Sequence, residues 1–314
     1  MHATVALTGA SGFIGGVIAQ HLRGAGWHVR GLVRSPQQAQ KLQDLEIEPV
    51  QGSLESPISL LDLVRDCVGV IHCAAAIRGA RREDFYATNV MGVSNIIKAC
   101  LAQSSPPRFA LLSSLAAREP SLSPYAWSKH EGELVLAREA GIIEWSIFRP
   151  PAVYGPQDRA LLPLFKLLRK GIGIQLGPSQ AKFSLIHVDD LAKAVLHWLK
   201  NGGPPFHTFE LDDGFPGGYS WNDVFRLSNP RLRICLHIAP FMLKILGKTN
   251  EIFSRIFGYV PLFTAGKVAE LLHPNWVCDN THITQTLGWA PQISLQEGLR
   301  RLFTSDRLMA SQRD

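Results

Sequence analysis

A phenol, an ammonium and two hydroxyls lie close together near the middle of this sequence. Tyr125 and Lys129 are four residues apart, and Ser113 and Ser114 precede them. In a helix, residues four apart project from the same face, so the phenol and the ammonium would meet the same ligand. The ordinary pKa of tyrosine is about 10, and a neighbouring cation favours the phenolate. The pattern therefore predicts a tyrosine that exchanges a proton with a substrate oxygen.

A glycine-rich segment near the start of the chain has the spacing of a phosphate-binding turn. Gly9, Gly12 and Gly15 follow the strand-like Thr4–Thr8 and open a helical pattern over Phe13–Leu22. The first glycine permits a tight turn, the second a close approach to a pyrophosphate, and the third close packing of helix on strand. The amino end of the helix attracts the phosphates. These residues predict that the chain binds NAD(H) or NADP(H).

The end of the second strand bears on which of the two nucleotides binds. Trp27–Val33 is strand-like, and Arg34 follows at the place where an acidic residue normally binds the ribose 2′-hydroxyl. A guanidinium there suits a 2′-phosphate instead. An exposed loop arginine is the alternative interpretation, so NADP is favoured over NAD without being established.

Strand-like and helical segments alternate along the first half of the chain. Further strands are expected at 48–51, 68–74, 109–112 and 144–148, and further helices at 37–45, 57–67, 85–103 and 125–140. This alternation predicts an α/β fold, a doubly wound parallel sheet whose strands all end at the edge where ligands bind. Beyond residues 149–151 the alternation is less regular. We therefore expect a nucleotide-binding domain over 1–155 and a smaller substrate-binding lobe over 156–314, with about 184–200 packing back on the first domain.

Composition excludes several other classes of function. The net charge of +6 is scattered and not interleaved with aromatic residues, so nucleic-acid binding is not expected. The five cysteines lie far apart without a CxxC pair, which predicts free thiols in a reducing compartment and no metal site. The first residues lack the features of a secretory leader. A cytoplasmic protein is expected.

The ordered motifs of the chain resemble those of the short-chain dehydrogenase/reductase superfamily. The resemblance rests on TGASGFIG (8–15), VIHCAAA (70–76), LLSSLAA (111–117), YAWSK (125–129), RPPAVYGP (149–156), IHVDDLAKA (186–194) and LGWAPQISLQEGL (287–299). The chain is most similar to the extended branch, the NAD-dependent epimerase/dehydratase family, and within it to members such as 3β-hydroxysteroid dehydrogenases and dihydroflavonol reductases. The resemblance implies a Rossmann fold and a nicotinamide cofactor.

The resemblance also implies roles for individual residues. Tyr125 would be the proton donor or acceptor, Lys129 would orient the nicotinamide ribose and lower the pKa of the tyrosine, and Ser114 rather than Ser113 would bind the substrate oxygen. Asn89 would brace the backbone of the site. The residues expected to line the cofactor are Gly9, Ser11, Gly12, Phe13, Ile14, Gly15, Arg34, Ser53, Leu54, Ala74, Ala75, Ala76, Lys129, Pro150 and Val153. A homodimer through the helices 85–103 and 125–140 would follow by analogy.

The substrate half departs from the sugar-nucleotide members of the family. Ala152 stands where they usually have an asparagine, and the segment 181–187 lacks their arginine–aspartate pair, so polar anchors for a diphosphate sugar are missing. The stretch 232–263 is instead rich in large apolar side chains, which suit a protein core, a substrate wall or a membrane contact; a core is the simplest interpretation.

The leading hypothesis is an NADP-dependent oxidoreductase that moves hydride between the nicotinamide and the carbonyl or secondary alcohol of a hydrophobic small molecule. A nucleotide-sugar epimerase or dehydratase is the first alternative, and a non-catalytic cofactor-binding assembly or sensor subunit is the second.

A few other polar residues are expected to be structural. His72 ends a buried strand and should be packed and hydrogen-bonded. His187, with Asp189 and Asp190, is expected to close the sheet against the lobe rather than bind a metal ion. Glu131 and Glu133 are expected to face solvent.

Overall fold

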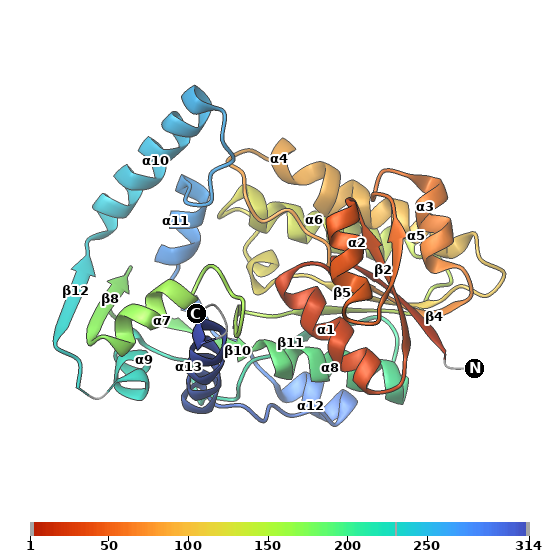
Figure 1. Cartoon of the computed structure of the whole chain (residues 1–314). Helices are drawn as coiled ribbons and strands as arrows, with labels where there is room; N and C mark the ends of the chain where they lie inside the picture. Colours follow the sequence, from red (N-terminus) through yellow and green to blue (C-terminus); the bar gives the residue numbers. More distant parts are fainter. Residues whose placement is uncertain (1–2, 230, 312–314) are drawn as a thin grey trace.

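A seven-stranded parallel sheet forms the centre of the molecule (Figure 1). The computed structural model describes residues 3–229 and 231–311. The strands of the sheet are β1 (Thr4–Thr8), β2 (His28–Val33), β3 (Glu48–Gln51), β4 (Cys67–His72), β5 (Arg108–Leu112), β6 (Trp145–Arg149) and β11 (His207–Glu210). They lie in the order β11-β6-β5-β4-β1-β2-β3. The predicted doubly wound sheet is confirmed.

The direction in which strands are added reverses at β1. Leu7 of β1 is paired with Gly31 of β2 on one side and with Ile71 of β4 on the other. The chain connections that leave the carboxyl ends of β1 and β4 therefore diverge. In a doubly wound sheet this divergence opens the crevice in which a nucleotide binds.

Helices cover both faces of the sheet. One layer consists of α1 (Phe13–Gly24), α2 (Pro36–Gln43), α8 (Val188–Asn201) and α12 (Thr281–Leu287), and the other of α3 (Pro57–Val64), α5 (Gly92–Leu101) and α6 (Pro124–Glu139). Side chains alternate between the faces of a strand, so β1 contributes Val5 and Leu7 to the first core and Ala6 to the second.

Three of these helices begin at the same two-residue sequence, serine followed by proline. The hydroxyls of Ser35, Ser56 and Ser123 accept a hydrogen bond from a backbone N–H in the first turn of α2, α3 and α6, and a proline follows each serine. The serine satisfies an otherwise unpaired N–H, and the proline ring is already in the helical conformation. The start of α6, close to Tyr125, is thereby fixed.

The lobe is built from short parallel strand pairs and helices. The pairs are β7 (Ala152–Tyr154) with β10 (Leu185–His187), β8 (Ile172–Leu176) with β12 (Ile234–Ile238), and β9 (Lys182–Phe183) with β13 (Asn275–Trp276). Its helices are α7 (Leu162–Arg169), α9 (Trp221–Ser228), α10 (Pro240–Phe257), α11 (Ala265–Leu272) and α13 (Leu295–Ser311). Across residues 3–229 and 231–311, no helix has the length and apolar character of a membrane span.

Several segments that follow residue 155 belong to the central layers. Strand β11 pairs with β6, and the helices α8 and α12 pack in the same layer as α1. Trp198 of α8 is fully buried, and its indole N–H donates to the Ser146 hydroxyl of β6 over 3.0 Å. The division of the chain into domains at residue 155 stays a prediction.

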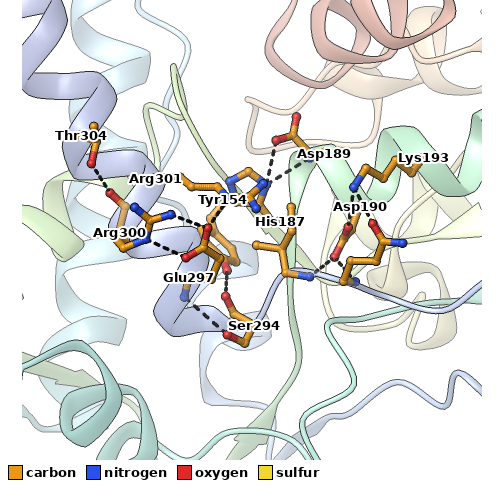
Figure 2. Close-up of polar contacts among 12 residues, drawn as sticks. Tyr154, His187, Asp189, Asp190, Lys193, Ser294, Glu297, Arg300, Arg301 and Thr304 are labelled. Carbon is orange, nitrogen blue, oxygen red and sulfur yellow. Dashed lines mark hydrogen bonds and ion pairs between the residues drawn. The ribbon is translucent and has the colours of Figure 1, made fainter. Parts of the chain in front are cut away.

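A buried carboxylate ties the C-terminal segment to α8. Asp190 has no exposed surface, and one of its oxygens accepts the backbone N–H groups of Gln292 and Ile293 over 2.8 and 2.7 Å. The Lys193 ammonium lies 4.0 Å from its other oxygen (Figure 2). The carboxylate therefore fixes the strand-like approach to α13 against the Rossmann layers.

We expect Asp190→Ala to lower the free energy of unfolding by about 3 kcal/mol, because two buried N–H groups lose their acceptor. Denaturant titration followed by circular dichroism measures the loss. Asp189→Ala is the matched control, because Asp189 is partly exposed and pairs only with His21 and His187. It should cost about 1 kcal/mol or less. Equal losses in the two variants would contradict the role given to Asp190.

Candidate active site

The glycine turn has the geometry that a dinucleotide requires. Gly9 has a φ of +73°, and a Cβ there would lie 2.8 Å from the backbone nitrogen of Ala74. A Cβ on Gly15 would overlap the Gly9 carbonyl. The Gly12 N–H donates to that carbonyl over 3.0 Å and closes the turn. Glycine is thus required at positions 9 and 15, by φ and by close approach respectively.

The amino end of α1 is available to an anion. Gly12 is its N-cap, no side chain of the described residues caps it, and its first turn carries no acidic residue. Ser11, Phe13 and Ile14 surround this end and are partly or fully exposed. Free N–H groups and the helix dipole favour a phosphate at such a site. The residues present therefore fit the pyrophosphate of a nicotinamide dinucleotide.

Two cations flank the turn on the side of β2. Arg34 follows β2 directly, is exposed, and is held through its backbone N–H by the side chain of Gln38 at 2.8 Å. The Lys41 ammonium of α2 donates to the Ser11 carbonyl over 3.0 Å. The sequence predicted Arg34 but missed Lys41, because only the packing of α2 beside the turn brings the lysine there.

The other predicted cofactor residues lie at the ends of β3 and β4. The Leu54 carbonyl, next to Ser53, accepts from the Asn95 side chain at 2.8 Å. The Ala74 N–H donates to the Thr8 hydroxyl at 3.1 Å, which joins the end of β4 to the end of β1. Ala75 and Ala76 continue in extended backbone and are partly exposed. All of them lie at the carboxyl edge of the sheet.

Asn89 holds the alanine segment in place, as expected. Its side-chain oxygen accepts the Ala76 N–H at 2.8 Å, and its amide donates to the Ala76 carbonyl at 3.0 Å and to the Ser128 hydroxyl at 2.9 Å. The expected helix over 85–103 is interrupted at this residue. It consists of α4 (Glu83–Tyr86), a π-helical turn (Ala87–Met91) and α5, and such turns are frequent at functional sites.

Tyr125, Lys129 and Ser114 come together at the end of β5. Tyr125 lies in the first turn of α6, is half-buried, and hydrogen-bonds with the Ser114 hydroxyl. Lys129 is buried one turn later and donates to the Leu112 carbonyl over 2.8 Å. Ser114 also accepts the Ala116 N–H at 3.2 Å and so begins a short 3₁₀ turn (Leu115–Arg118). The three predicted catalytic residues therefore form one cluster.

The protonation of this cluster differs from the expectation. The pKa of Tyr125 is raised to about 12, mainly by burial and next by the nearby Glu270 carboxylate, although the hydrogen bond with Ser114 lowers it. Burial lowers the pKa of Lys129 to about 8. The lysine was expected to lower the pKa of the tyrosine, but in this structure burial and Glu270 have the larger effect. The phenol is protonated at neutral pH and is therefore poised to donate a proton.

Ser113 binds not Tyr125 but Glu133, a residue that was wrongly predicted to face solvent. Its hydroxyl makes a short hydrogen bond to Glu133, and that carboxylate also binds the Arg149 guanidinium through both of its oxygens. Glu133 is 5% exposed and does not face solvent as predicted. It lies four residues after Lys129 on the same face of α6, a spacing that could have revealed its burial.

Two further residues at the tyrosine were not predicted. The ring of Phe85 contacts Tyr125 edge-on, with ring centroids 5.9 Å apart. Glu270 of α11 is buried, accepts a short hydrogen bond from Ser123 and pairs with Lys267 at 2.8 Å. The sequence around position 270 does not indicate that Glu270 contacts Ser123, because the two residues are 147 positions apart. The lobe thus delivers a carboxylate to the start of α6.

The last two predicted cofactor residues lie where β6 passes into the lobe. The Pro150 carbonyl accepts the Leu115 N–H at 2.9 Å, next to Ser114. Val153 lies in β7 and is paired with Ile186 of β10. This strand pair joins the end of β6, near Ser114, to the lobe.

His72 and His187 are both buried and hydrogen-bonded. Burial lowers the pKa of His72 to about 3, and the ring is hydrogen-bonded to the Thr8 hydroxyl at 2.9 Å. His187 caps α8 and stacks edge-on against Tyr154 of β7 (Figure 2). Within the described parts of the chain, no group of three or more metal-ligating side chains could hold an ion.

The apolar stretch 232–263 is not a core. Of its large apolar side chains only Leu243 is fully buried, and most of the rest are about half exposed or more. The interpretation of this stretch as core is therefore wrong. Most of its large apolar residues face outward on β12 and α10.

The comparison with known families agrees with the motifs. The model of the NAD-dependent epimerase/dehydratase family matches residues 5–211. The chain belongs to this family, as the motifs indicated, and it is an NAD(P)-dependent oxidoreductase of the extended short-chain type.

Its relatives include reductases, dehydrogenases and epimerases. Ceramide reductase of Caulobacter vibrioides is 34% identical over 279 residues, covering 87% of this chain and 85% of that protein. The decarboxylating sterol-4-alpha-carboxylate 3-dehydrogenase of Dictyostelium discoideum is 26% identical, with coverage of 95% and 99%. The structure of Thermotoga maritima UDP-glucose 4-epimerase with UDP-glucose has a TM-score of 0.75 at 19% identity, covering 98% and 99%, and shows the shared fold.

We expect Glu270→Gln to lower the pKa of Tyr125, because it removes a negative charge that opposes formation of the phenolate. In carbonyl reduction the protonated phenol is the active form, so the alkaline limb of kcat/KM that the Tyr125 phenol sets, above the limb that Lys129 sets near pH 8, should move to lower pH by roughly one unit.

The matched control is Lys267→Gln, which removes the cation that neutralises Glu270. It should move the same limb in the opposite direction. Shifts of the same sign in both variants, or none in Glu270→Gln, would show that Glu270 does not act through its charge.

Proposed function

We propose that this enzyme is an NADP(H)-dependent reductase of ketones on long-chain, lipid-like molecules, with Tyr125 as the proton donor. The observation that carries the proposal is the cluster of Ser114, Tyr125 and Lys129 with a phenol whose pKa is about 12. A group that stays protonated through the physiological range suits reduction, in which the carbonyl oxygen must gain a proton.

Each residue of the cluster has a distinct task in this reaction. Ser114 and Tyr125 donate hydrogen bonds to the carbonyl oxygen and polarise the carbonyl group. Bound NADPH supplies the hydride to the carbonyl carbon. The Tyr125 proton passes to the oxygen, which becomes a hydroxyl group. Lys129, charged below its pKa of about 8, stabilises the phenolate that is left and holds the nicotinamide ribose.

An apolar substrate is supported by what surrounds the tyrosine. The Phe85 ring contacts the phenol directly, and Ala152 offers no hydrogen bond where sugar-nucleotide enzymes usually have an asparagine. The relative with 34% identity is named for ceramide, a lipid. A diphosphate sugar would need polar anchors at these positions.

NADP is favoured by the cations beside the glycine turn. Arg34 and Lys41 both lie next to the end of β2, where a 2′-phosphate would be bound. A cytoplasmic location and a homodimer through α5 and α6 stay predictions; Leu101 and Leu134 are exposed on these helices.

We expect Tyr125→Phe to lower the turnover of any ketone that the enzyme reduces by about 100-fold or more, with the affinity for the cofactor nearly unchanged. Steady-state kinetics and NADPH fluorescence titration measure the two quantities. Tyr86→Phe is the control, because Tyr86 is exposed, stacks on Trp127 and should be neutral. An unchanged rate in Tyr125→Phe would contradict the proposed role.

The same assays separate the rival functions. A reductase oxidises NADPH in proportion to product, and the absorbance of the reduced nicotinamide falls. An epimerase returns the hydride to its substrate and gives no net change. Tight cofactor binding without turnover of any ketone or alcohol would favour a non-catalytic subunit.

We expect Arg34→Ala to lower kcat/KM for NADPH by about 10- to 100-fold and to leave that for NADH nearly unchanged, because only the former carries a 2′-phosphate. Kinetics with each cofactor at a fixed substrate concentration measure the ratio. Arg65→Ala removes an exposed arginine that pairs with Asp62 instead, and should not alter it. If Arg34→Ala leaves the ratio of kcat/KM for NADPH to that for NADH unchanged, Arg34 does not bind the 2′-phosphate. Any preference for NADPH would then come from Lys41.

A further inference from the structure

Helix α10 packs on the molecule through its small and polar side. Leu243, Gly247 and Ser254 are its buried residues. Gly247 allows close approach to α11, where a Cβ would lie 3.0 Å from the Val268 side chain. Glu251 accepts the Ala265 N–H at 2.7 Å. The face that meets the protein therefore buries little apolar surface, the reverse of an ordinary surface helix.

The opposite side of α10 is apolar and open. Its exposed residues are Phe241, Met242, Ile245, Leu246, Ile252, Phe253, Ile256 and Phe257, with exposed fractions from 48% to 71%. On a helix of 3.6 residues per turn they cover an arc of roughly 160°. Ile234 and Leu236 of β12 and Tyr259, Val260 and Leu262 after α10 extend it. We call these thirteen residues the outer apolar surface; in Figure 1 α10 and β12 lie at the left edge, on the opposite side of the molecule from α3 and α5.

A basic stripe borders the apolar arc. Lys244, Lys248 and Arg255 follow one another at helical spacing and project along one side of it. All three are exposed, and no carboxylate in the described residues pairs with them.

We propose that the outer apolar surface and the basic stripe bind the enzyme to the surface of a membrane that contains anionic lipids. A helix with a wide apolar sector edged by lysine and arginine lies in the interface of a bilayer, with apolar side chains among the acyl chains and cations at the headgroups. A cluster of exposed large apolar side chains that is bordered by polar residues marks an interaction site. The net charge of +6 adds a general attraction to an anionic surface.

Charge decides between a membrane and a second copy of this chain. In an antiparallel two-fold dimer built on α10, the stripe of Lys244, Lys248 and Arg255 would lie along the same edge as its copy, and like charges at an interface oppose association. Anionic headgroups neutralise the stripe instead. The cores of protein interfaces are also depleted in lysine.

The outer apolar surface is connected to the segment that leads to Phe85, whose ring contacts Tyr125. The Gly79 N–H donates to the Pro261 carbonyl at 3.0 Å, which joins the loop after α10 to the segment between Ala76 and Phe85. Ile77 and Arg78 of that segment are exposed. If the proposed reduction of a lipid-like ketone is correct, substrate would pass from the membrane to Tyr125 along this contact. The docking itself does not depend on that reaction.

The test is co-sedimentation of the full chain with vesicles of phosphatidylcholine alone or mixed with phosphatidylglycerol. The protein should sediment with the mixed vesicles and less so at high ionic strength. Phe253→Ser with Phe257→Ser should weaken vesicle binding by about tenfold or more, since both rings leave the apolar arc. Lys244→Gln, Lys248→Gln and Arg255→Gln together should abolish the preference for phosphatidylglycerol.

The matched control is Ile58→Ser with Ile142→Ser, two side chains that are 75% and 78% exposed in the Rossmann domain. It should bind vesicles like the unaltered chain. Retained NADPH binding shows that each variant is folded, independently of any ketone. The proposal is overturned if the unaltered chain does not sediment with mixed vesicles, if the control variant loses as much binding, or if light scattering shows a dimer that the Phe253/Phe257 variant dissociates.

Discussion

The site depends on one buried ion pair, between Glu133 of α6 and Arg149 at the end of β6. Tyr125, Lys129 and Glu133 are spaced by four, so they lie on one face of α6. A carboxylate that is 5% exposed is stable only beside its partner, and the partner is fixed at the carboxyl edge of the sheet. The ion pair between Glu133 and Arg149 therefore orients the face of α6 that carries Tyr125 and Lys129 toward the carboxyl edge of the sheet. The same carboxylate binds Ser113, which leaves Ser114 free to meet the phenol.

Burial then sets the chemistry of that face. The same low-polarity surroundings raise the pKa of Tyr125 and lower that of Lys129, because in both cases the charged form is the one disfavoured. The two pKa values, which are nearly equal in water, therefore move apart to about 12 and about 8, so the phenol keeps its proton at a pH at which the lysine can lose one. Glu270 adds a negative charge from the lobe and biases the phenol toward its protonated form.

The sequence correctly predicted those parts of the site whose residues lie close together along the chain. The strand, turn and helix around Gly9–Gly15, the helix with Tyr125 and Lys129, and the bracing by Asn89 all follow from spacing and known turn geometry. Glu133 was misplaced because a glutamate is ordinarily exposed and its partner is at the end of another strand. Glu270 and Lys41 depend on packing between distant segments, which a single sequence does not contain. The sequence showed that 232–263 is rich in apolar residues, but it did not show that most of them are exposed. The apolar face of a helix ordinarily packs on the protein core, so the sequence pattern predicted burial.

Polar contacts on the opposite side of α10 explain why its apolar face points outward. Asn250 donates to the Phe263 carbonyl at 2.7 Å, Glu251 accepts from Ala265, and Gly247 and Ser254 bring the helix close to its neighbours. These polar contacts fix the small side of α10 against α11, and turning the helix over would break them. The apolar arc is thereby kept on the outside, where its burial adds nothing to folding. Its free energy of burial is available only to a partner, and α11, fixed to the same contacts, carries Glu270 to the tyrosine. One segment of the lobe thus joins the outer apolar surface to the reacting groups.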